Sequence, residues 1–327
     1  KGIRTFVIKD TRIGTKRSVT EDYHSMTYLE NYFEKIDKDT ASDGKEKKTA
    51  RAFLKNFREN PKPYYPTESP AARPTTRRKQ FIFLSPTKIL NSLFWIAKLF
   101  VLYFTNNNRD DHETIKPWHH LFDRLKRKLR VLIGFNGLYD EVNEKEDFGF
   151  YPLHMEPEIA TMLYAPFFTD QLWLIKQIAR SLPLQYKLYV KEHPAMFGFR
   201  TRSFYKELKK IPNVRIIRPT VSGFDIIKNA KIITTITGPA GWEGVLLKKP
   251  VVTFGDVFYN KLPMVARCRA IEDLPHIIKN QLENLTHDED KLINFIAAIY
   301  KEGVDVDLCK LWTLDGGGNM KEKEQEL

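Results

Sequence analysis

The later part of the chain alternates short apolar runs with segments in which apolar residues recur at helical spacing. The runs typical of buried strands are "FGFYPL", "YKLYVKE", "VRIIR", "KIITTIT" and "PVVTFG". After the first run, Asp170 or Thr169 can cap a helix that carries Leu172, Ile175 and Ile178 on one face. This alternation predicts right-handed crossovers and a parallel sheet covered by helices on both faces. We therefore expect an α/β, doubly wound domain at residues 148–300 and a tail at 301–327.

The earlier part has few strand signals. They are "RTFVIKD" near the start and "QFIFL" at 80–84, whereas residues 26–37, 46–58 and 113–132 have helical spacing. The segment from Asn60 to Pro74 contains five prolines, which cannot continue a helix, and it reads as a linker. We expect residues 1–140 to form a mainly helical N-terminal part with connecting helices.

One apolar run, "ILNSLFWIAKLFVLYF" at 89–104, needs a separate interpretation. It carries Lys98 in its middle and is shorter than the roughly 20 residues of a spanning helix, so we expect no crossing of a bilayer. With Arg77, Arg78 and Lys79 upstream, it could lie in a membrane interface with its lysines at anionic headgroups. The alternative is a buried helix that connects two lobes.

Charge separates the two parts further. Residues 1–140 hold 28 Lys and Arg against 16 Asp and Glu, whereas residues 141–327 hold 25 of each, so the first part carries the whole net charge of +12. Such asymmetry indicates an anionic partner, such as lipid, nucleic acid or a charged acceptor, unless it is only a solvated basic face. No aromatic stripe, zinc pattern or helix-turn-helix signature favours nucleic acid.

Composition places the chain among globular proteins. It has 327 residues, of which 42% are hydrophobic, and this is enough for a substantial core. Two cysteines cannot build a disulfide framework, so a reducing compartment, the cytoplasm, is expected. No signal-like series opens the chain at Lys1, so we expect a secretory signal to be absent or already removed.

The carboxyl ends of parallel strands are where an open α/β sheet binds its ligand. The second strand ends in "KEHPAMFGFRTR", where Pro194 holds His193 in extended geometry. Lys191, Arg200 and Arg202 add the positive charge that a phosphate requires. The alternative is a structural or solvated histidine.

Two further loops carry candidate groups. In "TITGPAGWEG", Thr237 ends a strand, Gly238 permits close backbone approach and Pro239 suits a first helical turn, so the following amides can bind an anion. Glu243 lies one turn further on, where it can accept hydrogen bonds from a sugar hydroxyl. A plain strand-to-helix turn is the alternative.

The loop "PLHMEPE" carries His154, Glu156 and Glu158, which could act as acid, base or hydroxyl ligands. Ordinary loop polarity is equally compatible with these residues. At the end of the last strand, Asp256 in "FGDVFY" lies in range of the same crevice.

These motifs carry a family resemblance. "FYPLHMEPE", "LYVKEHP" and "TITGPAGWEGVLLKKPVVTFGDVFY", in this order over residues 148–262, resemble the bacterial capsule polysaccharide biosynthesis family. Its members are glycosyltransferases of two-lobed GT-B architecture and include the Kdo transferases. The His-Pro pair also occurs in bacterial sialyltransferases and teichoic-acid polymerases, which use cytidine-activated donors.

The resemblance implies a nucleotide-sugar site in the C-terminal lobe. His193 and the turn from Thr237 to Gly241 would contact the phosphates of a donor, expected to be a CMP-sugar, and Glu243 would contact the donor as well. Residues 1–140 would form the acceptor lobe, with too few strands for a complete one. The sialyltransferase acidic base motif is absent from the sequence.

We therefore expect a metal-independent glycosyltransferase without a resident cofactor, which acts on a glycan or glycolipid acceptor. His193, Lys191 and the helix start at Gly238 would stabilise the departing phosphate. His154 or Glu158 would be the acid or base. We expect it in the cytoplasm, peripheral on the inner face of the cell membrane. The alternatives are a nucleotide-sugar epimerase of similar architecture and a non-catalytic module that binds membrane or nucleic acid.

Overall fold

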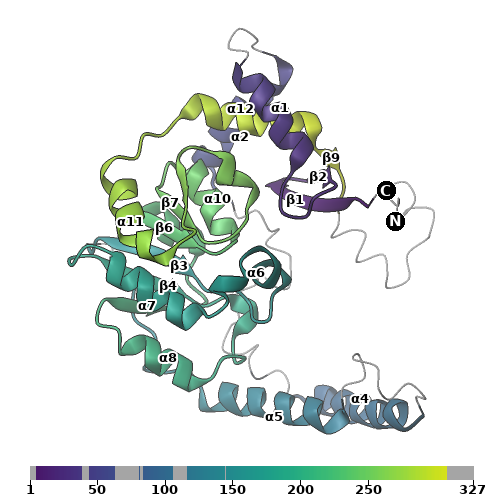
Figure 1. Ribbon diagram of the computed structural model, residues 1–327. Helices are drawn as coiled ribbons and strands as arrows, with labels where there is room; N and C mark the ends of the chain where they lie inside the picture. Colours follow the sequence, from purple (N-terminus) through teal and green to yellow (C-terminus); the bar gives the residue numbers. More distant parts are fainter. Residues whose placement is uncertain are drawn as a thin grey trace.

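A six-stranded parallel sheet forms the centre of the computed structural model (Figure 1). The structure describes residues 5–38, 44–62, 81, 84–105, 116–143 and 145–307. The strand order is β5-β4-β3-β6-β7-β8, so the order reverses between β3 and β6. The strands are β3 (Phe148–Pro152), β4 (Lys187–Lys191), β5 (Val214–Ile217), β6 (Ile232–Thr235), β7 (Val251–Thr253) and β8 (Val265–Arg267).

Helices cover both faces of this sheet, because its strands are apolar on both sides. Leu188, Tyr189 and Val190 of β4 are all fully buried, as expected for a strand inside a parallel sheet. One buried cluster packs the sheet against α7 (Gln171–Ser181), α8 (Arg202–Lys209) and α11 (Leu274–Glu283). The other packs it against α9 (Gly223–Asn229), α10 (Pro239–Leu246) and α12 (Glu289–Glu302). The predicted α/β fold class with a doubly wound C-terminal domain is confirmed.

The first segment of the chain packs against its last helix. The hairpin of β1 (Val7–Ile13) and β2 (Lys16–Thr20) pairs with β9 (Val304–Asp305). Two helices, α1 (Thr27–Lys38) and α2 (Lys45–Glu59), pack against α12, as Figure 1 shows above the sheet. Phe33 of α1 meets Phe295 edge-on at 5.2 Å. Elements almost 300 residues apart in the sequence are therefore neighbours in space.

Most predicted elements have counterparts. The predicted helices 26–37 and 46–58 correspond to α1 and α2, and 113–132 to α5 (Pro117–Ile133). The Asp170 side chain caps α7 by accepting a hydrogen bond from the Trp173 amide at 3.0 Å. The strand predicted at 80–84 and the linker at 60–74 lie mostly outside the described residues. The more helical character of the N-terminal part is confirmed, and the division into domains stays a prediction.

The apolar run forms α4 (Pro86–Thr105), and none of its residues is buried. The interpretation of this run as a buried connecting helix is therefore wrong. The helix has 20 residues, whereas the apolar run has 16. Contrary to our expectation, its length therefore does not exclude a crossing. Within the described part of the chain, α4 is the one helix long and apolar enough to cross a membrane.

Candidate active site at the carboxyl ends of the strands

Three loops at the carboxyl ends of β3, β4 and β6 enclose one cavity of about 360 Å³. This is the place expected for a ligand, because the strand order reverses between β3 and β6 and the following loops separate there. Nine of the residues that we singled out from the sequence line it: His154, Glu158, Lys191, His193, Pro194, Thr237, Gly238, Pro239 and Glu243. The structure thus brings together loops from three separate strands.

His193 is held as a neutral hydrogen-bond donor. Its Nδ1 accepts a hydrogen bond from the Ala195 amide at 3.2 Å, which leaves the ring proton on Nε2. Burial, assisted by the charges of Lys191 and Arg200, lowers the pKa of His193 to about 4. The imidazole is therefore uncharged at neutral pH, and its free N–H belongs to the wall of the cavity.

His154, which we expected as an acid or base, is hydrogen-bonded within the protein. Its Nε2 accepts a hydrogen bond from the Thr237 amide at 3.2 Å, and burial lowers its pKa to about 3. A ring whose accepting nitrogen is already engaged is a poor acid or base. Together with Thr235, whose Oγ1 accepts from the Gly238 amide at 3.0 Å, His154 fixes the turn before α10.

This arrangement changes the expected anion site. The amides of Thr237 and Gly238 are bonded within the protein, so they are not available to a ligand. The first-turn amides of α10 that follow Pro239 have no acceptor within the helix, and Ala240 lines the cavity. An anion would therefore meet the amides that follow Pro239, as the sequence suggested, and not those of Thr237 and Gly238.

Two cations border the cavity. Lys191 is buried and donates to the Pro219 carbonyl at 3.2 Å, and burial lowers the pKa of its ammonium group to about 8. Arg12 reaches the same cavity from the β1–β2 hairpin. Its backbone has a φ of 58°, in the left-handed region that L residues seldom adopt, at an irregularity in the hairpin register. The sequence analysis missed Arg12, because no local sequence pattern indicates that this hairpin reaches the cavity.

Two carboxylates face these cations. Burial raises the pKa of Glu158, which moves this side chain toward the range of an acid or base at neutral pH. Glu243 lies on the second turn of α10 and is 9% exposed. Arg12 and Glu243 also line a neighbouring hollow of about 220 Å³, whose wall includes Phe57 and Trp242. The two hollows thus share Arg12 and Glu243 as part of their walls.

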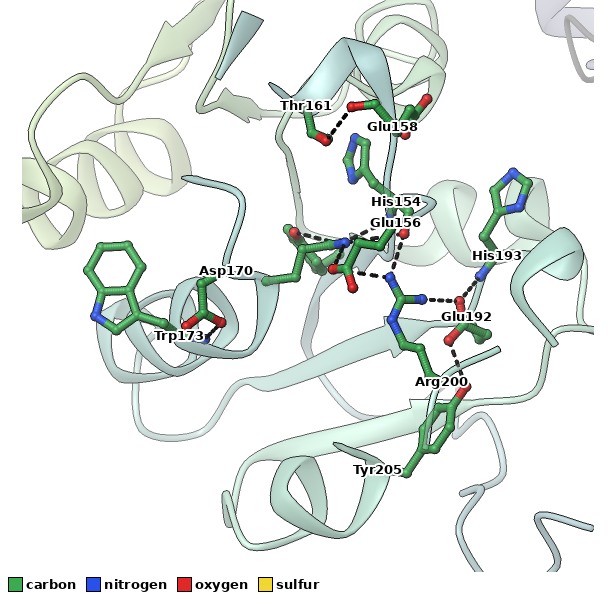
Figure 2. Close-up of polar contacts among 12 residues, drawn as sticks. His154, Glu156, Glu158, Thr161, Asp170, Trp173, Glu192, His193, Arg200 and Tyr205 are labelled. Carbon is green, nitrogen blue, oxygen red and sulfur yellow. Dashed lines mark hydrogen bonds and ion pairs between the residues drawn. The ribbon is translucent and has the colours of Figure 1, made fainter. Parts of the chain in front are cut away.

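A buried ionic brace joins two of the cavity loops (Figure 2). Arg200 donates from Nη1 to Glu192 Oε1 and from Nη2 to the His154 carbonyl, both at 2.6 Å. Glu192 is fully buried and also accepts from the Tyr205 hydroxyl at 2.6 Å and from the His193 amide at 2.6 Å. In Figure 2, Arg200 lies between the loop of His154 and the loop of His193. It holds the two loops at a fixed separation.

Four of the predicted donor-binding residues do not line the cavity: Arg200, Arg202, Gly241 and Asp256. Arg200 forms the brace. Arg202 donates to the Gly134 carbonyl beside α5. A Cβ at Gly241 would lie 2.3 Å from the Tyr259 hydroxyl, so this glycine permits close packing. Asp256 pairs with Arg267 at 2.6 Å and with His24 at 3.1 Å.

Among the residues that the structure describes, no group of three His, Cys, Asp or Glu side chains could hold a metal ion. Arg12, Lys191 and the start of α10 line the cavity and supply positive charge or partial positive charge to it. Neutral N–H donation comes from His193. Such a cavity can bind a phosphate group and stabilise negative charge as it develops.

The chain matches one family model and one curated protein. Residues 136–268 match the family model described as capsule polysaccharide biosynthesis protein. Protein FixF of Sinorhizobium fredii is 28% identical over 123 residues, which cover 37% of this chain and 29% of FixF. This chain therefore spans well under half of that relative.

Solved structures similar to this chain include a transferase and an epimerase. The beta Kdo 2,7 transferase of Thermosulfurimonas dismutans KpsC is 17% identical with a TM-score of 0.36, over 62% of this chain and 57% of that one. The UDP-GlcNAc 2-epimerase of Methanocaldococcus jannaschii is also 17% identical, with a TM-score of 0.35, over 56% and 51%. The family match covers β3 to β8 and every loop of the cavity except the hairpin that carries Arg12. Residues 136–268 thus match the capsule polysaccharide biosynthesis family, and the resemblance seen in the sequence is confirmed over this part of the chain.

Proposed function

We propose that this chain is a glycosyltransferase of bacterial surface polysaccharide synthesis, which transfers a sugar from a nucleotide-activated donor to a glycan or glycolipid acceptor. The observation that carries the proposal is the convergence of His193, Lys191 and the start of α10 on one cavity. Its volume of about 360 Å³ suits the donor-sized ligands that such clefts bind. The cytidine-using relatives of the His-Pro loop favour a CMP-sugar as the donor.

In the proposed reaction, an acceptor hydroxyl oxygen bonds to the anomeric carbon while the bond from that carbon to the phosphate oxygen breaks. The His193 N–H, the Lys191 ammonium group and the α10 amides stabilise the charge on the departing phosphate. Arg12 adds a second permanent cation. The step uses these groups in place of a metal ion and needs no resident cofactor.

Glu158 is the base in this proposal. It lines the cavity, and its raised pKa brings it closer to the value that suits proton transfer at neutral pH. His154 is a positioning residue, because its Nε2 is occupied by the Thr237 amide. Replacement Glu158→Gln should therefore lower kcat by 10²- to 10⁴-fold and leave the donor Kd within about twofold.

Nucleotide binding tests the proposal directly. CMP, CDP, UDP and GDP are added separately to the protein, and the melting temperature is followed, since a ligand that binds only the folded state raises it. We expect CMP to raise the melting temperature of the wild type and to have no effect on His193→Ala. His276→Ala, on the exposed side of α11, is the matched control and should respond as the wild type does.

The catalytic part needs a second assay. Labelled CMP-sugar is incubated with and without an acceptor, and a product that forms without acceptor and retains the nucleotide would indicate an epimerase instead. Absence of any nucleotide response in the wild type, or an unchanged response in His193→Ala, would refute the assignment of this cavity.

We also propose that the protein acts in the cytoplasm, peripherally on the inner face of the cell membrane. The excess of Lys and Arg in residues 1–140 supports this location, since anionic lipids attract basic segments. Separation of membrane and soluble fractions of cells that express the protein tests this location, with extraction by carbonate as the second step. A protein found wholly in the soluble fraction would contradict it.

A further inference from the structure

The helices α4 and α5 form an arm that extends from the end of the sheet domain (Figure 1). They run antiparallel, because Tyr103 near the end of α4 meets Trp118 at the start of α5, with ring centroids 5.5 Å apart. Trp95 in the middle of α4 lies 3.7 Å from the Arg124 guanidinium. The far end of α5 is attached to the domain, where Arg127 stacks on Phe199 at 4.1 Å.

Each helix carries an apolar stripe whose side chains remain exposed among the described residues, although Trp118 also contacts Tyr103. On α5, the exposed apolar side chains fall within about 100° of arc at 100° per residue, and they are Trp118, Phe122, Leu125, Leu129, Leu132 and Ile133. On α4, Leu90, Leu93, Phe94, Val101 and Phe104 form a stripe in which Phe94 is 79% exposed, and Ile89 and Leu102 are exposed on either side of it. Exposed apolar surface of this extent and regularity indicates a binding surface.

The arm is also strongly basic. The two helices hold seven Lys and Arg side chains and one acidic residue, Asp123, which gives a net charge of +6. Aromatic side chains accompany the aliphatic ones on both helices. An apolar stripe flanked by cations matches a bilayer surface, where acyl chains lie beneath anionic headgroups.

We propose that the α4–α5 arm is a membrane-docking device that lies in the plane of an anionic bilayer. Its apolar stripes enter the boundary between headgroups and acyl chains, and its Lys and Arg side chains contact lipid phosphates. This inference names the element behind the proposed peripheral location and rests on that proposal. It does not depend on glycosyl transfer.

The pairing of the helices argues against a crossing by α4. A crossing helix would carry its antiparallel partner into the hydrocarbon, and α5 bears six charged side chains. Each charge at the centre of a bilayer costs at least ~2.5 kcal/mol, so the total exceeds what the apolar residues of α5 can offset. Docking in the plane leaves all of these charges in the headgroup region.

Vesicle flotation tests the proposal with the full chain. The protein is mixed with vesicles of phosphatidylcholine alone or with 30 mol% phosphatidylglycerol, a composition chosen to be about as anionic as a bacterial membrane surface. We expect flotation with the anionic vesicles that weakens as salt rises, and little with the neutral ones. Carbonate should release the bound protein.

Variants locate the contact. Phe94→Glu combined with Phe122→Glu should reduce the partition coefficient at least tenfold, and Lys126→Gln should reduce it about fivefold. The controls apply the same chemical changes elsewhere: Leu184→Glu with Phe167→Glu, at side chains 99% and 89% exposed, and Lys35→Gln on α1. We expect the controls to bind vesicles as the wild type does.

Two further measurements keep the result decisive. All variants should retain the far-UV circular dichroism and the nucleotide-induced melting shift of the wild type, so a failure to dock is separate from a failure of the cavity. Absence of flotation by the wild type, or equal loss in the control variants, would overturn the proposal. If the wild type forms a dimer and binds no lipid, and the Phe94/Phe122 variant is monomeric, the surface mediates protein contacts instead. That result would overturn the proposal as well.

Discussion

Arg200→Met is the substitution that tests most sharply how the cavity is held together. The guanidinium of Arg200 is buried and bonds to Glu192 and to the His154 carbonyl, each at 2.6 Å. Methionine fills a similar length of side chain without charge. The variant therefore leaves the Glu192 carboxylate buried without its cation and releases the link between the loops of His154 and His193.

The expected cost follows from the burial of the pair. Removal of one partner of a buried ion pair destabilises a protein by about 3–5 kcal/mol, since the remaining charge keeps its desolvation penalty. Glu192 is fully buried, and the hydroxyl of Tyr205 and the His193 amide still donate to it, so we expect a value near ~3 kcal/mol. At about 2–4 °C per kcal/mol, the melting temperature should fall by roughly 6–12 °C.

Urea unfolding and nucleotide titration measure the two consequences. We expect a lower midpoint and at least a tenfold weaker nucleotide Kd under conditions where the variant is folded. Arg218→Met, at an arginine 55% exposed that pairs with Glu141, is the control and should change stability by less than ~1 kcal/mol. In a cycle with Glu192→Gln, the double variant should cost less than the sum of the single ones. A stable Arg200→Met variant with unchanged nucleotide affinity would refute the brace.

Three other outcomes are expected. Arg12→Met should weaken nucleotide binding by about tenfold and reduce its salt dependence, as measured by titration at two salt concentrations; equal affinity would remove Arg12 from the site. Gly241→Ala should lower the melting temperature, because its Cβ would lie 2.3 Å from the Tyr259 hydroxyl, and an unchanged value would show that Tyr259 can move. The folded-state pKa values of His154 (about 3) and His193 (about 4) lie below the unfolded value of 6.5, so the unfolded chain binds more protons as the pH falls below 6.5. Each histidine should therefore lower the free energy of unfolding by roughly 2 kcal/mol at pH 5 relative to pH 7.5. In urea titrations, His193→Gln should lose about 2 kcal/mol less than the wild type between these two pH values.

Local sequence signals were sufficient for the sheet domain. Its strands are apolar on both faces, and its helices begin at side chains that cap them, such as Asp170 and Ser222, which accepts from the Asp225 amide at 3.4 Å. The position of the cavity also followed, because parallel strands place their carboxyl ends at one edge of a sheet. Strand patterning and the position of parallel strand ends, applied without coordinates, place His193 and Gly238 at the same cavity.

Contacts between distant segments could not be predicted in the same way. Nothing in the sequence near Arg12 indicates that the β1–β2 hairpin pairs with β9 and reaches the cavity. The same limit explains why we assigned Arg200 as well as Lys191 to the phosphate, since the two cations look alike in the sequence of a basic loop. Only the fold shows that a buried carboxylate, Glu192, engages Arg200 and not the Lys191 ammonium group.

The electrostatics of the cavity indicate which charge its ligand carries. Among the described residues, the Lys191 ammonium group forms no ion pair, and burial holds its pKa at about 8. The same burial, with Lys191 and Arg200 nearby, keeps His193 neutral. A phosphate that entered would favour the charged form of both groups, because an opposite charge within 4–6 Å stabilises ionisation. The two pKa values would then rise together. Anion binding should therefore be coupled to proton uptake, whereas a neutral sugar in the same cavity would leave both groups unchanged.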